Sequence, residues 1–197
     1  IAKQYAHIPQ EIQDAAVASF THNVGADLDH RNRDFHLKLT KGVEFPYDDA
    51  SGAEKAVHIY PIDFENPENN SFWAVNQFSI TGKNKRRPDI IIYINGLPLV
   101  VFELKNWYDE HTNIKEAHNQ IQHYKKDIPL LFEYNALTVI SDGNEAQHGM
   151  YSSGQEWFAA WKSIDGKQTF NDEDLQVHTM LFGLFPIQRA IWIIRSS

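Results

Sequence analysis

The chain has 197 residues, of which 42% are hydrophobic and none is cysteine, and its formal net charge is -8. This length and apolar content suit one folded domain and exclude a disordered chain. Without cysteine there are no disulfides or thiolate metal sites, which fits a reducing cytoplasm. No apolar stretch approaches the roughly 20 residues of a membrane span. The acidity argues against a domain that grips nucleic acid tightly by itself.

The N-terminal third predicts two helices followed by two short strands. A proline opens residues 9–20, in which apolar side chains recur at helical spacing. Residues 31–39 predict a second helix, which Gly42 would end. Residues 42–47 and 55–63 are expected to form strands on either side of a polar loop.

The middle of the chain predicts a mixed sheet. Two neighbouring strands are apolar on both faces and therefore central in the sheet. Hairpin connections make the first three strands antiparallel, whereas a helical crossover lets the fourth run parallel to one of them. The expected fold class is α/β, with a mixed central β-sheet flanked by helices. The strands are expected at 72–80, 89–94, 98–105 and 135–141, and helices at 113–127, 172–183 and 186–195.

Two carboxylates and a lysine lie at the ends of the two central strands. Asp89 follows Pro88 at the start of one strand, and Glu103 and Lys105 lie two residues apart near the end of the next. Residues two apart on a strand point to the same face, so Glu103 and Lys105 lie together. The alternative is structural: Glu103 and Lys105 would form an ordinary ion pair if their strand lay at a solvated edge of the sheet. Charges beside buried strands are costly unless paired or bound to metal, which favours a functional site.

The connection between the strands decides whether Asp89 joins this pair. A tight two-residue loop at Asn95-Gly96 would place Asp89 opposite Phe102, on the wrong face. A three-residue loop, or one β-bulge, would bring Asp89 to the face of Glu103. A shared site therefore predicts a bulged or three-residue connection here.

This set of side chains suits metal-dependent phosphodiester hydrolysis. Mg²⁺ takes oxygen ligands, which Asp89, Glu103 and the backbone carbonyl of Leu104 would supply. Lys105 would orient a water molecule or offset charge in the transition state. Proline–aspartate followed by glutamate–x–lysine resembles the active site of the PD-(D/E)xK nucleases.

Two further groups are candidates for a supporting role. Gln120 and Tyr124 lie four apart, on one side of the predicted helix, where they would contact a phosphate or Lys105. Taken alone, ordinary core packing is the better explanation of these two residues. A basic loop precedes Asp89, and contact with DNA phosphate competes there with a simple solvated charge run. The loop carries Lys83, Lys85, Arg86 and Arg87.

Longer stretches resemble one family. IDFENPENNSFWAVNQFSI, RRPDIIIYINGLPLVVFELKN, the QIQHYK helix and NALTVISDG occur in this order and spacing. Together they resemble the N-terminal nuclease domain of the motor (R) subunit of type I restriction enzymes, in the RecB-like branch of the PD-(D/E)xK nucleases. The resemblance implies that Asp89, Glu103 and Lys105 are catalytic, and that Gln120 and Tyr124 form the Q-x3-Y element.

The resemblance also implies a larger assembly. A helicase-like motor would use ATP to translocate double-stranded DNA, while methyltransferase (M) and specificity (S) subunits would hold the recognition site. No phosphate-binding loop of the form G-x4-G-K-[ST] occurs, so ATP would act only through a motor absent from this chain. We therefore expect a nuclease domain over residues 1–165, shortened at its N-terminus relative to the family, and a helical connector toward the motor over 166–197.

Two other functions are compatible with the sequence. The chain would serve as a non-catalytic module that docks onto DNA or partner subunits, or as a self-sufficient repair or resolvase-like nuclease on the same fold. The net charge of -8 argues against the self-sufficient nuclease.

Overall fold

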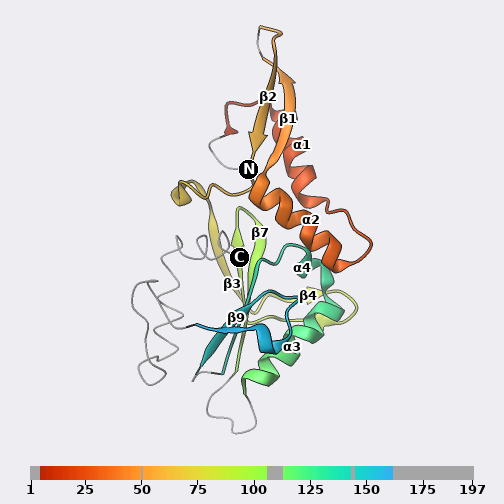
Figure 1. Cartoon of the computed structure of the whole chain (residues 1–197), viewed down its shortest axis with the longest axis vertical. Helices are drawn as coiled ribbons and strands as arrows, with labels where there is room; N and C mark the ends of the chain where they lie inside the picture. Colours follow the sequence, from red (N-terminus) through yellow and green to blue (C-terminus); the bar gives the residue numbers. More distant parts are fainter. Residues whose placement is uncertain (1–4, 50, 106–112, 143–144, 162–197) are drawn as a thin grey trace.

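The chain folds around one central sheet, from which a narrow hairpin projects at one end (Figure 1). The structure is a computed structural model that describes residues 5–49, 51–105, 113–142 and 145–161. The helices expected at 172–183 and 186–195, and the connector expected at 166–197, lie outside the described residues. None of the helices in the described part of the chain is both long and apolar enough to cross a membrane.

In the part of the chain that the structure describes, the central sheet has six strands in the order β10-β9-β8-β7-β6-β3. Strands β7 and β8 are parallel, and every other neighbouring pair is antiparallel. This confirms the predicted mixed sheet, in which the α3 crossover joins the two parallel strands. The strands are β3 (Phe72–Asn76), β6 (Ile90–Ile94), β7 (Leu97–Leu104), β8 (Leu137–Ser141), β9 (Ala146–Gly149) and β10 (Ala159–Ala160).

Two small two-stranded sheets lie outside the central one. The first, β1–β2, is the projecting hairpin, and the second, β4–β5, follows β3. The predicted strand at 72–80 ends early because Gln77 adopts a positive φ of 48° and turns the chain out of the sheet. The strands are β1 (Val43–Asp48), β2 (Glu54–Ile59), β4 (Ile80–Thr81) and β5 (Lys85–Arg86), and two 3-10 turns span Pro67–Asn69 and Gln155–Trp157.

The helices begin and end where local chemistry dictates. The Asp27 side chain accepts from the amide of His30 at the start of α2, and Gly42 ends that helix with a φ of 66°. The Asn113 side chain caps α3 in the same way as Asp27 caps α2. The helices predicted at 9–20, 31–39 and 113–127 are confirmed, and α4 was not predicted. Within the described ranges the helices are α1 (Gln10–Thr21), α2 (Leu28–Lys41), α3 (Ile114–Asp127) and α4 (Pro129–Glu133).

Both faces of the central sheet are buried. Ile91, Val101 and Ile140 point to the face covered by α3 and α4, and their strand neighbours point to the other face, where Phe35 and Leu39 of α2 pack. Burial on both faces explains why the β6 and β7 sequences are continuously apolar.

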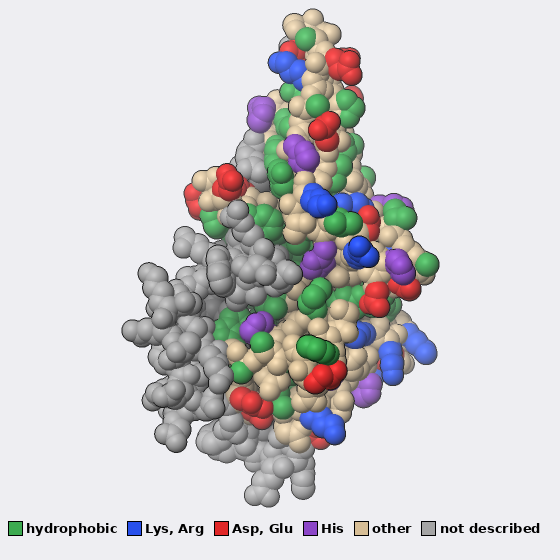
Figure 2. Space-filling model, in the orientation of Figure 1, with side chains coloured by type: hydrophobic (Ala, Val, Ile, Leu, Met, Phe, Trp, Pro, Cys, Tyr) green, Lys and Arg blue, Asp and Glu red, His purple; other side chains and the backbone are tan. Residues whose placement is uncertain are grey.

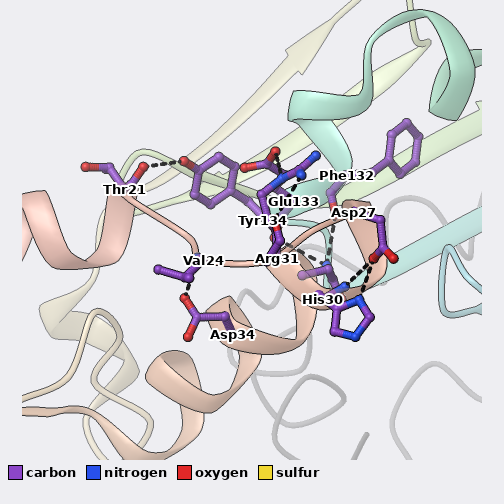
Figure 3. A network of polar contacts seen from close by, with 11 residues as sticks. Thr21, Val24, Asp27, His30, Arg31, Asp34, Phe132, Glu133 and Tyr134 are labelled. Atoms are coloured by element: carbon purple, nitrogen blue, oxygen red, sulfur yellow. Dashed lines mark hydrogen bonds and ion pairs between the residues drawn. The ribbon is translucent and has the colours of Figure 1, made fainter.

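Polar contacts fix α1 and α2 against α4 and the residue that follows it (Figure 3). Arg31 Nε donates to Glu133 Oε1 at 2.5 Å, and the Tyr134 hydroxyl donates to the carbonyl of Thr21 at 3.0 Å. Asn32 is buried and donates to a backbone carbonyl of α4 at 2.9 Å. Because α4 packs on α3, these contacts also fix the helix that covers the candidate site.

Candidate active site

The connection between β6 and β7 contains a β-bulge, which is one of the two arrangements that a shared site predicts. Next to the turn, Ile94 pairs with Leu97, but farther along Ile92 pairs with Val100, so that Leu99 has no partner on β6. This shift carries the register to Ile90 opposite Phe102. The residue before Ile90 therefore falls opposite the residue after Phe102.

Those two residues are Asp89 and Glu103. The Asp89 carboxylate accepts from the backbone N–H of Leu104 at 2.8 Å, at the point where β6 no longer supplies a partner. The Asp89 carbonyl accepts from the amide of Gln77 at 2.7 Å. Asp89 is thus held from both neighbouring strands, on the face of Glu103.

Glu103 is the buried carboxylate of the pair, with 4% of its surface exposed. Lys105 Nζ donates to its Oε1 at 2.8 Å, and the Tyr124 hydroxyl donates to its Oε2 at 2.9 Å. Burial raises the pKa of the Glu103 carboxyl, the hydrogen bond from Lys105 lowers it, and the negative charge of Asp89 raises it again. Asp89 is therefore close enough to act on Glu103 electrostatically.

Tyr124 and Gln120 reach the site from α3. Burial raises the pKa of Tyr124, and the charge of Glu103 raises it further, so its hydroxyl stays protonated and donates at neutral pH. The Gln120 side chain hydrogen-bonds this hydroxyl, which also approaches the carbonyl of Arg87 at 3.4 Å. The structure thus brings all five sequence-predicted polar side chains, Asp89, Glu103, Lys105, Gln120 and Tyr124, to one end of the sheet.

The donors at this end fit a hard divalent cation. Two carboxylates of like charge, one of them buried, repel each other until a cation lies between them. In the described residues no group of three His, Asp or Glu side chains is arranged for a metal. Asp89 and Glu103 are therefore the two candidate carboxylate ligands at this end of the sheet, and the carbonyl of Leu104 stays a predicted third ligand.

The basic segment before Asp89 forms the β4–β5 hairpin, and its positive side chains differ in environment. Lys83, Lys85 and Arg87 are exposed, whereas Arg86 is half-buried and its Nε donates to Asp127 Oδ2 at 2.6 Å. Lys and Arg side chains gather at the edge of the molecule where this hairpin meets the end of α3 (Figure 2). The predicted role of all four in DNA contact stays a prediction.

Comparison with known proteins identifies the family. Residues 1–157 match the family described as Type I restriction enzyme R protein N terminus. The chain belongs to this family. The resemblance deduced from the motifs is confirmed, and the match includes every candidate residue from Lys83 to Tyr124.

Individual relatives of the R protein N-terminal family agree. The chain is 38% identical over 201 residues to the type I restriction enzyme HindI endonuclease subunit of Haemophilus influenzae, a match that covers 99% of this chain and 19% of that protein. It is 33% identical over 155 residues to the putative MjaIXP endonuclease subunit of Methanocaldococcus jannaschii, covering 77% of this chain and 14% of that protein. The EcoprrI endonuclease subunit of Escherichia coli is 36% identical over 109 residues, which are 53% of this chain and 33% of that protein. The chain thus spans a minor part of the length of these relatives.

Sequence reasoning missed two residues around the site of this family member. Gln77, whose amide donates to the Asp89 carbonyl, adopts a φ of 48° that its residue type did not reveal. Asp127 binds the basic hairpin from the last position of α3. An acidic residue at a helix C-terminus opposes the helix dipole, and this was the available signal that Asp127 has a partner elsewhere.

Proposed function

We propose that this chain is a Mg²⁺-dependent nuclease domain that hydrolyses phosphodiester bonds of double-stranded DNA. One observation carries the proposal: the bulge at Leu99 brings Asp89 onto the face of Glu103 and Lys105, at the end of a buried sheet. Keeping two carboxylates there costs stability, which is expected of a site built for a ligand and not of a structural ion pair.

Each residue has a defined task in this proposal. Asp89 and Glu103 would hold the metal, which would acidify a bound water and stabilise charge on the scissile phosphate. The Leu104 amide fixes the Asp89 carboxylate, and the Tyr124 hydroxyl fixes that of Glu103. Lys105 is paired with Glu103 at 2.8 Å and remains partly exposed, so its ammonium can turn toward a water molecule or a phosphate oxygen.

The names of the relatives support a larger assembly. Several are called endonuclease subunits of type I restriction enzymes, which supports a DNA substrate and a multi-subunit complex for this chain. We propose that ATP-driven translocation by a helicase-like motor precedes cleavage, and that M and S subunits supply site recognition, in the cytoplasm. The acidic chain, with its net charge of -8, would depend on these partners to hold DNA.

Isosteric variants of the two carboxylates test the proposal. We expect Asp89→Asn and Glu103→Gln each to weaken Mn²⁺ binding to the 197-residue chain, and to lower DNA cleavage by the assembled enzyme about 1000-fold or more. ATP turnover and the unfolding midpoint should stay near wild type. Glu54→Gln, an exposed acid on β2, is the matched control.

Three outcomes separate the alternatives. Cleavage that survives both carboxylate variants would leave the chain as a docking module. Loss of ATP turnover in these variants would point to a structural role for the pair. Efficient cleavage by the chain alone, without ATP or partners, would support a self-sufficient nuclease.

We also expect Lys105→Ala to abolish cleavage while Mn²⁺ still binds, because Lys105 is proposed to act on water or phosphate and not as a ligand.

A further inference from the structure

The β4–β5 hairpin is fastened to the end of α3 by one residue, Asp127. Its carboxylate accepts from Asn84 Nδ2 at 2.8 Å and from the Arg86 guanidinium, whose Nε lies 2.6 Å away. Its backbone carbonyl accepts from the amide of Lys83 at 2.8 Å. A Cβ atom at Gly82 would lie 2.1 Å from the same carbonyl oxygen, so the close approach requires glycine there. Four positions of the hairpin, Gly82, Lys83, Asn84 and Arg86, thus meet a single acidic residue.

Asp127 lies at a position that is unfavourable for a negative charge, which indicates that its contacts with the hairpin stabilise the structure. Its side chain is buried, with 6% of its surface exposed, and a buried carboxylate needs a partner charge. It is also the last residue of α3, where the helix dipole disfavours negative charge. The hydrogen bonds from Asn84 and Arg86 compensate both penalties and lower the pKa of Asp127, which keeps it ionised.

The same turn of α3 contacts the candidate active site. Tyr124, three residues before Asp127, donates to Glu103 at 2.9 Å and approaches the carbonyl of Arg87 at 3.4 Å. Residues three apart on a helix lie on the same side. One helical turn therefore holds a metal-binding carboxylate and the backbone of the basic hairpin in a fixed relation.

Because Arg86 is bound to Asp127, the basic side chains of the hairpin point in different directions. Arg86 turns toward α3 and is half-buried, whereas Lys85 and Arg87, its neighbours along the chain, are exposed, as is Lys83 at the hairpin tip. Successive residues of an extended strand point to opposite sides, so anchoring Arg86 presents Lys85 and Arg87 outward. Arg87 lies two residues before Asp89.

We infer that Asp127 is a positioning residue for DNA cleavage, which fixes the β4–β5 hairpin through Arg86 so that Lys83, Lys85 and Arg87 bind the phosphates that flank the scissile bond. This inference rests on the proposed nuclease function and divides the basic segment into an anchor and a DNA-binding set. The partner chemistry is the phosphate backbone of double-stranded DNA, recognised without regard to base sequence.

A double-mutant cycle tests the inference. Asp127→Asn and Arg86→Gln should each lower cleavage by the assembled enzyme about tenfold, since small misplacements of positioning groups carry costs of this size or larger. The double variant should lose no more than either single variant, because both act through the same contact. ATP turnover should not change. Lys126→Gln, which removes an exposed charge from the same turn of α3, is the control.

A second readout does not depend on activity. Hydrogen exchange in the 197-residue chain should become faster over residues 82–87 in Asp127→Asn and Arg86→Gln, while Mn²⁺ affinity stays at the wild-type value. Lys85→Gln and Arg87→Gln should lower cleavage without changing this exchange. Gly82→Ala should displace the hairpin from Asp127 and leaves every charge in place. It should therefore also give faster exchange over residues 82–87 and lower cleavage, as Asp127→Asn does.

The outcomes are distinguishable from failure of the proposed function. Removing a negative charge beside DNA would by itself strengthen phosphate binding, so faster cleavage in Asp127→Asn would overturn the inference. It is equally overturned by faster hairpin exchange with unchanged cleavage, or by additive losses in the double variant. The nuclease proposal fails instead if Asp89→Asn and Glu103→Gln still cleave, whatever the hairpin variants do.

Discussion

Asp89 lies on the same face of the sheet as Glu103 because the strand that carries Glu103 contains one residue more than its partner strand can pair. The turn at Asn95-Gly96 has two residues, and Leu99 is the extra one. Leu99 and Val100 both pack in the core on the α2 face, although they are consecutive, which is the mark of a bulge. The position of the first carboxylate thus depends on a backbone irregularity three to four residues from the turn.

Deletion of Leu99 should therefore separate the two carboxylates. Without the bulge the two-residue turn would set the register along both strands, and Asp89 would face away from Glu103. We expect Mn²⁺ affinity to fall about 100-fold or more, because one of two carboxylate ligands is lost. Isothermal titration calorimetry measures this affinity.

The control for this deletion is Leu99→Ala. Leu99 is fully buried, so its truncation should cost about 2–5 kcal/mol of stability while the register stays intact. Mn²⁺ binding should persist in Leu99→Ala. Equal loss of binding in both variants would mean that packing, and not register, positions Asp89.

The raised pKa of Glu103 predicts how pH affects the site. Burial raises it above the ordinary glutamate value of 4.5, so the folded chain holds a proton on Glu103 at a pH where the unfolded chain has released it. The free energy of unfolding of the metal-free chain should fall as pH rises from this ordinary value to the folded-state value. Mn²⁺ affinity should rise over the same interval, because the ligand must be ionised.

Glu103→Gln isolates this effect. Denaturant titrations at several pH values should show that the variant loses the fall in stability, whereas Glu54→Gln, an exposed acid, retains it. Identical pH profiles for wild type and Glu103→Gln would show that another group titrates.

Tyr124→Phe tests the link between α3 and the metal site. The hydroxyl donates to Glu103 at 2.9 Å and lowers the pKa of that carboxyl, so its removal should raise the pKa further and move the onset of Mn²⁺ binding to higher pH. Groups that orient a metal ligand typically contribute about 10- to 100-fold in affinity, which is the loss we expect. Tyr134→Phe removes a hydroxyl bonded to the carbonyl of Thr21 and should leave the profile unchanged. A shift in both variants would remove the argument for a specific role of Tyr124.

Much of this architecture could be predicted because its signals are local and strong. The helical spacing in α1 and α3, and the continuous apolar runs of β6 and β7, gave the elements that build the sheet. The shared face of Glu103 and Lys105 followed from the two-residue period of a strand. Because successive strand residues alternate faces, the register between the two strands decides whether Asp89 joins Glu103. The hypothesis of a shared site thus became a prediction about the backbone, and the bulge at Leu99 confirmed it.

What could not be predicted depends on contacts between distant residues. Helix α4 has five residues, too few for a periodic pattern, and β9 carries the sequence Ala-Gln-His-Gly, which has little intrinsic preference for a strand. Their structure is set by packing on α3 and on β8. The bond between Arg86 and Asp127 spans 41 residues, and it was missed, because the one local signal for it was the unfavourable charge at the end of α3.

The Asn95 side chain should contribute more stability than the turn geometry at Gly96. Its Oδ1 accepts from the amide of Ser71 at 2.8 Å, and its Nδ2 donates to the carbonyl of Pro61 and to Asn70, each at 2.8 Å. Asn95→Ala removes all three hydrogen bonds, although Asn70 Oδ1 still accepts from the amide of Asp63, and should lower the free energy of unfolding by about 2–3 kcal/mol. Gly96→Ala, at a φ of 85°, should cost about 1 kcal/mol.

Urea denaturation measures both, and Mn²⁺ affinity should not change in either variant, because this turn lies at the opposite end of β6 from Asp89. A smaller loss in Asn95→Ala than in Gly96→Ala would show that the turn, and not the side-chain bridge, holds this end of the sheet.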